Sequence, residues 1–405
     1  MAIDHSIIRV MDDYYSMVVR RDRYGILRKE IKPRKKPEII QDYGKDVLLT
    51  IPKYDGFCLS PDNINFKQVH TEGKYRFFNT YKPFAYTPKE GEWKWTKVLL
   101  EHIFGEQYHI GLIYLQVLYK YPEQALPVLA LVSQTRQTGK STFIDWLTAM
   151  YGDNMVILNP GDFNNSHNHI YAYANIIAVE ETAIDKNSTV EKVKALSTQK
   201  MMTVNPKFVQ QYTLPFFGKI IMASNNEDKF MKVDEDEIRF FVRKVGLPTK
   251  ANHNILNDMI KEIPAFIHYL NSLPEPDFSR SRMVFTAEEL SNESLDKVKH
   301  ESKEWMHKEL EELLTDFLEN NSSAEPNLLV SPTDIKNKFF NHNNQIQISY
   351  LRKVLQTSFK FPKSEHTIRY QPFFIDPSTT GRPFIIDKYL FIDKKPNQQD
   401  EELPF

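Results

Sequence analysis

The sequence predicts a parallel α/β sheet in the middle of the chain, with a phosphate-binding loop at its first strand. Three apolar runs, at residues 126–132, 175–179 and 216–223, have the length of buried strands, and segments with helical spacing alternate with them. Strands that alternate with helices form parallel sheets in three-layer α/β domains. A short glycine-containing motif follows the first run directly, and this motif gives the first indication of function.

The first apolar run leads into a Gly-Lys-Ser-Thr sequence, and residues 143–150 then have helical spacing. A strand, a loop and a helix in this order form a P-loop, whose backbone N–H groups and helix N-terminus point at phosphate oxygens. Lys140 would reach the β- and γ-phosphates, and the Ser141 hydroxyl would hold Mg²⁺. We therefore expect ATP and Mg²⁺ as ligands. The predicted nucleotide-binding residues are Thr138, Gly139, Lys140, Ser141 and Thr142.

Gln134 departs from the usual P-loop pattern, G-x-x-x-x-G-K-[ST], because it occupies the position of the first glycine. That glycine commonly allows a sharp turn with a positive φ. The sequence therefore leaves two alternatives: a strained backbone at Gln134, or a loop that opens differently from the usual one.

Polar side chains follow the second and third apolar runs. Glu180 and Glu181 come directly after the second run, and we assign Glu180 to the Mg²⁺ shell and Glu181 to the general base that polarises the attacking water. Asn225 follows the third run, where an amide can contact the γ-phosphate or the water as a sensor. The alternatives are a surface acidic pair at a strand end and an ordinary turn asparagine.

Two arginines, Arg239 and Arg243, flank an apolar segment after the third run. An arginine at this point would reach the γ-phosphate of a neighbouring subunit's nucleotide, which typically contributes ~10³–10⁵ in rate. Arg239 is the first candidate and Arg243 the second. The alternative is a surface strand in which arginines and apolar residues alternate.

The order of these motifs resembles that of the superfamily 3 helicases, a branch of the AAA+ ATPases, and most closely the phage and poxvirus-type primase–helicase group. Residues 78–81 resemble the segment before the family's helical lead-in, and residues 262–270 resemble the helix that closes its ATPase domain. The likeness covers roughly residues 75–275. It implies an AAA+ P-loop fold, a ring-shaped homo-oligomer, with a hexamer as the family expectation, and a replicative DNA helicase that moves on single-stranded DNA. The implied catalytic residues are Lys140, Glu181, Asn225 and Arg239.

The resemblance also implies a hairpin that grips single-stranded DNA in a central pore. The best match to this motif is residues 203–208, in which Lys207 would contact a phosphate and Phe208 would pack on a sugar or base. An ordinary β-hairpin with a charged tip is the alternative. Other nearby candidates are Lys192, Lys194 and Lys200.

The flanking sequence predicts three domains. These are a small α+β accessory domain at residues 1–92, the AAA+ domain with its helical lead-in at 93–275, and a C-terminal domain at 276–405. The lead-in is predicted as a helix over residues 95–121, and an amphipathic helix is predicted over 255–273, where Pro264 would kink it or split it in two. Residues 20–36 are rich in arginine and lysine, and form either a solvated, mobile hairpin or an arm that contacts phosphates.

In the C-terminal domain, a charged helix is predicted at about 286–318, and a further helix begins with Ser331 or Thr333 as its cap. A second helix at about 348–359 and two strands, at 367–375 and 382–392 around a turn at 377–381, complete a winged-helix-like pattern, in which the second helix often enters a DNA groove.

Composition excludes several classes of protein. The 405 residues carry a net charge of −1 and one cysteine, Cys58, so attraction to nucleic acid must come from local patches, and an intrachain disulfide or a cysteine zinc cluster is excluded. No apolar run approaches the roughly 20 residues of a membrane span. We expect no membrane partner and a cytoplasmic location, in a bacterial host if the source is a phage. His167 and His169 lack a further metal ligand at useful spacing and are assigned to a solvated loop.

Two other functions remain open at this point. One is an AAA+ protein-remodelling or loading factor, and the other is an ATP-dependent origin-binding module. The first 92 residues show no acidic metal cluster for primer synthesis, so a separate primase or other replication proteins are expected as partners.

Overall fold

The computed structural model describes residues 7–159, 162, 168–180, 187–205, 211–225, 239–248, 252, 254–321, 325–341 and 346–392. The chain folds into two compact units that divide between Asp296 and Lys297. None of the described helices combines the length and the apolar character that a membrane crossing requires.

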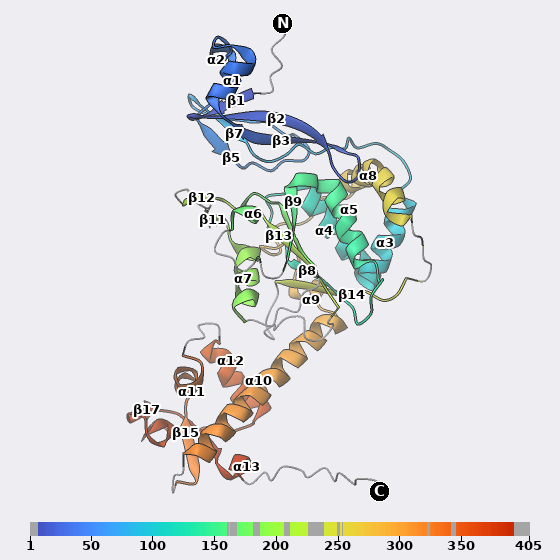
Figure 1. The fold of residues 1–405 in the computed structure, drawn as a ribbon. Helices are drawn as coiled ribbons and strands as arrows, with labels where there is room; N and C mark the ends of the chain where they lie inside the picture. The colour runs from blue at the N-terminus through green and yellow to red at the C-terminus, as the bar shows by residue number, and fades with distance from the viewer. Residues whose placement is uncertain are drawn as a thin grey trace, which may run out of the picture. The chain divides into compact units, whose positions relative to one another are not determined.

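A five-stranded parallel sheet forms the centre of the first unit (Figure 1). Its strands, in sequence order, are β8 (Val128–Val132), β9 (Met155–Leu158), β10 (Ile176–Val179), β13 (Lys219–Ser224) and β14 (Phe240–Lys244). Their spatial order is β14-β8-β13-β10-β9, which confirms the predicted parallel sheet and adds β9 and β14 at its edges. Because β13 lies between β8 and β10, the carboxyl ends of these three strands adjoin each other.

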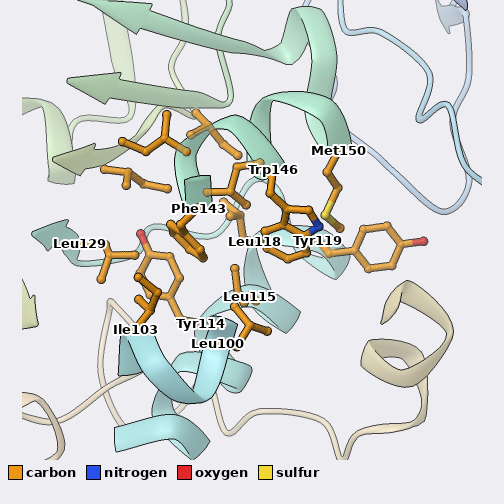
Figure 2. Packing of buried hydrophobic residues seen from close by; sticks show 14 of the residues in the cluster. Leu100, Ile103, Tyr114, Leu115, Leu118, Tyr119, Leu129, Phe143, Trp146 and Met150 are labelled. Atoms are coloured by element: carbon orange, nitrogen blue, oxygen red, sulfur yellow. The ribbon is translucent and has the colours of Figure 1, made fainter. Parts of the chain in front are cut away.

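Four helices form the main core with one face of this sheet. They are α3 (Lys94–Phe104), α4 (Tyr108–Lys120), α5 (Lys140–Tyr151) and α8 (Ile255–Ser272). Phe143 and Trp146 of α5 pack in one cluster with Leu115 and Leu118 of α4 (Figure 2). Strand residues that point to the other face, such as Ile177, are also fully buried, so the sheet is covered on both sides.

Two predicted helices differ in detail from the sequence pattern. The helix predicted over residues 95–121 is broken at Gly105, which has φ +47 and opens a 3₁₀ turn, Gly105–Gln107, between α3 and α4. Helix α8 passes through Pro264 without being split. The Pro264 carbonyl accepts a hydrogen bond from the Lys89 N–H at 3.0 Å.

The N-terminal part contains two small sheets. The first has the order β3-β2-β1-β4 and the second β5-β7-β6. The elements are β1 (Ile7–Val10), β2 (Asp13–Arg21), β3 (Leu27–Arg34), α1 (Lys36–Tyr43), α2 (Val47–Thr50), β4 (Lys53–Tyr54), β5 (Gly56–Cys58), β6 (Val69–Glu72) and β7 (Tyr75–Asn79). In the segment 78–81, Asn79 is buried and its amide ties the Ser60 and Lys67 carbonyls together.

The basic stretch 20–36 forms the β2–β3 hairpin, but the tip of this hairpin is not solvated on all sides. Arg28 is only 6% exposed and donates to the Ala149 carbonyl in the last turn of α5 at 2.6 Å. Arg23 pairs with Asp145 at 2.5 Å, and Arg20 pairs with Asp153 at 3.0 Å. Arg28 and Arg23 therefore fasten the hairpin to α5, and Arg20 fastens it to the 3₁₀ turn Gly152–Asn154 that follows α5. These three side chains are not free in solvent, whereas the first of the two alternatives expected a solvated hairpin.

The rest of the described chain begins with α9 (Ala287–Leu290) in the first unit. There follow α10 (Glu293–Asn320), β15 (Asn327–Val330), α11 (Pro332–Phe339), α12 (Ile348–Lys353), a π-helical turn (Val354–Ser358), β16 (Ile368–Tyr370), β17 (Thr379–Gly381), β18 (Phe384–Asp387) and α13 (Tyr389–Ile392). Ser331 is the N-cap of α11, as predicted, and forms a capping box with Asp334. The charged helix predicted from residue 286 is divided into α9 and α10.

The predicted pairing of two C-terminal strands is wrong. The segment at 382–392 contributes β18, which pairs with β15 and not with β16. Strand β16 pairs instead with β17, which falls in the predicted turn. The physical reason is burial, because Phe384 and Ile386 of β18 are both fully buried in the C-terminal core beside Leu328 and Val330.

Candidate nucleotide-binding site

The loop between β8 and α5 contains two residues with left-handed backbone angles. Positive φ angles occur at Gln137 (φ 59) and Gly139 (φ 92), and not at Gln134. The loop therefore opens differently from the usual pattern, and the substitution of glycine by Gln134 imposes no left-handed strain. At Gly139 a Cβ atom would also lie 3.3 Å from Leu99 Cδ1 of α3, so glycine suits this position for both reasons.

Lys140 is held inside the loop by three side-chain oxygen atoms. Its Nζ donates to Ser133 Oγ, to Thr138 Oγ1 at 3.2 Å and to Asn225 Oδ1 at 3.1 Å. The side chain is 7% exposed, and burial lowers the pKa of its ammonium. The lysine therefore lies at the carboxyl edge of the sheet, and its three side-chain partners among the described residues are all uncharged. Its charge is thus available to an anion.

Glu180 and Asn225 lie at the ends of neighbouring strands, as the sequence predicts, and line one pocket with the loop. The pocket has a volume of about 260 Å³. Its lining residues are Arg136, Gln137, Thr138, Gly139, Lys140, Ser141, Thr142, Glu180, Ala223 and Asn225. Glu180 Oε1 is buried and has no hydrogen-bond partner among the described residues, an arrangement that suits a carboxylate awaiting a cation.

Helix α3 supports the loop from outside the motif. His102 Nε2 lies 2.9 Å from the Thr138 carbonyl oxygen, so this nitrogen must carry the proton and donate it. At the other end of α3, the Glu262 carboxylate of α8 accepts hydrogen bonds from the Trp95 and Thr96 N–H groups at 3.0 and 2.8 Å. Helix α3 is thus fixed at its N-terminus by α8 and contacts the β8–α5 loop near its C-terminus.

The two candidate arginines lie in different places. Arg243, the second candidate, donates to Gln107 Oε1, which also accepts from Asn292 Nδ2, and burial lowers the pKa of its guanidinium. Arg239 immediately precedes β14, and its carbonyl accepts from Val128 N at the start of β8. Since β8 and β14 are parallel, Arg239 lies at the amino edge of the sheet, a strand length of roughly 16 Å from the loop of its own subunit.

Several predicted site residues lie outside the described residues: Glu181, Lys207, Phe208 and His167. The stems of the predicted hairpin are described and form an antiparallel pair, β11 (Met201–Val204) and β12 (Tyr212–Pro215). Asn168, between the two histidines, holds this hairpin, because its side chain donates to the Thr203 carbonyl at 2.8 Å and accepts from Asn205 N at 2.9 Å. Among the described residues, no cluster of histidine, cysteine and acidic side chains could hold a metal ion.

One protein family matches the region that contains this pocket. Residues 131–243, which contain Lys140, Glu180 and Asn225, match a protein family described as a family of unknown function (DUF5906). No curated protein matches the chain.

Solved structures of the C-terminal region of NrS-1 are similar to this chain in fold. The apo structure of residues 305–718 of NrS-1 has a TM-score of 0.59 at 15% identity, over 91% of this chain and 96% of that one. Two structures of its A form have TM-scores of 0.57 and 0.58 at 14% and 16% identity, with the same coverage. This mixed α/β architecture with a parallel sheet is therefore shared over most of both chains.

Sequence reasoning missed three residues of the site. Ser133 and Arg136 lie within the loop itself, and His102 comes from α3. Arg136 had a detectable signal, since a cation within a phosphate-binding loop is a candidate phosphate contact. The contact of His102 with the loop depends on how α3 packs against α5, which no local pattern encodes.

Proposed function

We propose that this chain is a Mg²⁺-dependent ATPase of the superfamily 3 helicase kind, which moves along single-stranded DNA. The observation that carries the proposal is the contact between Lys140 Nζ and Asn225 Oδ1, in the same pocket as the unpartnered Glu180 oxygen. A loop lysine, a carboxylate and a polar amide, gathered at the carboxyl ends of three adjacent strands, are the groups that hydrolysis of a nucleoside triphosphate requires.

The pocket favours a polyphosphate tail as its occupant. Its volume of about 260 Å³ is small for a whole nucleotide in the usual range of ligand pockets. Lys140 and the loop N–H groups would bind the β- and γ-phosphate oxygens, and Asn225 would orient the group that attacks. Ser141 and Glu180 are the residues that would hold Mg²⁺, which when bound neutralises phosphate charge. Glu181 retains its proposed role as general base.

The trans-acting arginine and the DNA contact complete the proposal. Arg239 lies too far from the loop of its own subunit to contact a phosphate there, so we assign it to the nucleotide of a neighbouring subunit in a ring, with a hexamer as the expected size. The β11–β12 hairpin would carry Lys207 and Phe208 to single-stranded DNA. Phosphate contacts of this kind should make DNA binding salt-dependent, with a slope of about −0.7 per phosphate.

The test is ATP hydrolysis with and without single-stranded DNA, in the wild type and in Lys140→Ala. We expect hydrolysis that DNA stimulates and that the substitution lowers by ~10²-fold or more, because the lysine stabilises transition-state charge. Hydrolysis that depends on Lys140 but is indifferent to DNA would favour the protein-remodelling alternative. Absence of hydrolysis at all protein concentrations would refute the proposal.

A further inference from the structure

A second pocket lies at the amino edge of the same sheet, at the base of the β11–β12 hairpin. Its volume is about 350 Å³. Residues 196–200 precede β11 and residues 216–219 follow β12, so both ends of the hairpin border the pocket. The remaining wall is formed by residues 123–125 and Arg282. The pocket is separated from the phosphate loop by the length of β13, which is roughly 20 Å.

The floor of the pocket is a fixed polar network. Lys219, 3% exposed at the start of β13, donates to the carbonyl oxygens of Pro122 and Phe217. Burial lowers the pKa of Lys219 to about 7, against the opposing influence of the nearby Glu123 carboxylate. Asn175 Nδ2 donates to the same Pro122 carbonyl at 2.8 Å. These contacts hold the half-buried Phe217 in place at the wall.

The hairpin ends and the outer wall are also tied down. The Phe216 N–H donates to the Lys200 carbonyl at 2.9 Å, which closes the base of the hairpin. Gln124 Nε2 donates to the Arg282 carbonyl at 2.7 Å, which fixes the backbone that carries this arginine. The pocket therefore has a preformed shape, which lowers the entropic cost of binding.

The charges at the rim favour an anion. Lys200 and Arg282 are exposed, and neither side chain has an ion-pair partner among the described residues. Glu123 is the one acidic side chain among the described residues of the lining. Phe217 adds an aromatic surface beside the two cations, and an aromatic ring next to cations is the combination on which single-stranded nucleic acid stacks a base and places a phosphate.

We propose that this pocket binds one nucleotide unit of single-stranded DNA, with a phosphate at Lys200 and Arg282 and a base against Phe217. The inference rests on the proposed function, and it adds a DNA contact at the fixed base of the hairpin to the one expected at its tip. The volume of about 350 Å³ falls in the range that accommodates a ligand of this size.

Strand β13 connects this pocket to the candidate nucleotide-binding site. This strand begins at Lys219 beside the pocket and ends at Ser224, directly before Asn225, which contacts Lys140. Occupation of the pocket by DNA would therefore act on one end of a buried strand whose other end carries the sensor. We expect DNA stimulation of hydrolysis to depend on the pocket, while hydrolysis without DNA does not.

The experiment measures binding of a fluorescent oligothymidylate by anisotropy over a series of salt concentrations. The variants are Lys200→Glu combined with Arg282→Glu, Phe217→Ala, and Lys74→Glu as an exposed charge-reversal control from the β6–β7 turn. We expect the double reversal to weaken binding at least ~10-fold and to reduce the salt slope by about 0.7. Phe217→Ala should weaken binding by roughly 5- to 100-fold. The control should bind like the wild type.

Hydrolysis without DNA serves as the test of folding, since all three changes are remote from the phosphate loop. Thymidine monophosphate and inorganic phosphate are then tested as competitors, which distinguishes DNA from a free nucleotide or free phosphate as the ligand of the pocket. We expect unlabelled oligothymidylate to displace the fluorescent oligothymidylate, and the two small competitors to leave it bound. If the pocket variants bind the oligothymidylate like the wild type, the pocket is not a DNA-binding site, and the proposed function is unaffected. If the wild type itself binds no single-stranded DNA, the helicase proposal fails and this inference with it.

Discussion

At the scale of single residues, Asn225 is the side chain that joins the phosphate loop to the rest of the site. It lies at the end of β13 and accepts a hydrogen bond from Lys140 Nζ at 3.1 Å. In the proposed function Asn225 is a sensor of charge that develops during hydrolysis, so Asn225→Ala should lower kcat by roughly 10²-fold and change the KM for ATP little. Steady-state ATPase kinetics measure both values, with Asn65→Ala, an exposed asparagine, as control. A higher KM at unchanged kcat would assign Asn225 to ground-state binding.

Lys219 gives a prediction for the pH dependence of stability. Burial lowers its pKa from 10.5 to about 7, so between these pH values the unfolded chain binds more protons than the folded chain. The free energy of unfolding should therefore rise with pH above about 7, by at most about 1.4 kcal/mol per pH unit from this group. Urea denaturation at pH 7 and pH 9 should show this rise in the wild type and in Lys74→Met, and a smaller one in Lys219→Met. An equal rise in all three proteins would rule out the buried lysine as its source.

At the scale of elements, the N-terminus of α3 is capped by a side chain from α8. Glu262 accepts from the Trp95 and Thr96 N–H groups and from Thr96 Oγ1 at 2.9 Å. These are among the N–H groups that a helix leaves unpaired, and a carboxylate there also interacts favourably with the helix dipole. Glu262→Gln should lower the free energy of unfolding by about 1–2 kcal/mol, measured by chemical denaturation. Exposed Glu92→Gln is the control, and equal stability of the two variants would contradict the capping role.

The contact between the β2–β3 hairpin and α5 depends on the glycine that ends α5. Gly152 has φ +55, and a Cβ atom there would lie 2.4 Å from Arg28 Cζ. Gly152→Ala should therefore displace the Arg28 guanidinium from the Ala149 carbonyl and cost roughly 1–3 kcal/mol in stability. Gly246→Ala is a matched control, because a Cβ atom there meets nothing within 4 Å. Thermal unfolding compares the two variants, and similar melting temperatures would show that the hairpin tolerates the change.

The elements that the sequence predicted best are those in which local pattern and burial agree. Strand β8, the loop and α5 combine a fully buried apolar run with the Gly-Lys-Ser motif, and both signals are local. The sequence pattern does not distinguish β14 from a surface strand, because Arg239 and Arg243 flank its buried residues, Phe240 among them. Its place beside β8 and the pairing of β18 with β15 arise from contacts between residues far apart in the chain, which periodicity does not encode.

The same limit applies to the candidate site. Lys140, Glu180 and Asn225 could be predicted because each follows an apolar strand, and parallel strands bring their carboxyl ends to one edge. The second pocket could not be predicted, because it is formed by segments before β11, after β12, before β8 and around Arg282. Only the fold brings these four segments together.

At the scale of the whole molecule, the role proposed for Arg239 depends on a second subunit. Arg239 lies at the amino edge of the sheet and Lys140 at the carboxyl edge, so each active site would take one residue from each of two neighbours. Lys140→Ala and Arg239→Ala should both be nearly inactive alone, with Arg239→Ala losing ~10³-fold or more. Hydrolysis by the wild type should also rise more steeply than linearly with protein concentration at dilutions where the oligomer dissociates.

Mixing the two inactive variants provides the sharpest test of this shared site. The Arg239→Ala subunit keeps Lys140, and the Lys140→Ala subunit keeps Arg239. In a mixed oligomer, an interface is therefore intact where the first subunit contributes Lys140 and the second contributes Arg239. Random mixing in equal amounts makes about a quarter of the interfaces intact, so the mixture should recover up to roughly a quarter of wild-type hydrolysis if sites act independently. Lys140→Ala mixed with Lys140→Met is the control and should recover none. If the first mixture stays inactive although subunits exchange, Arg239 does not act across the interface, and the site must be completed within one chain.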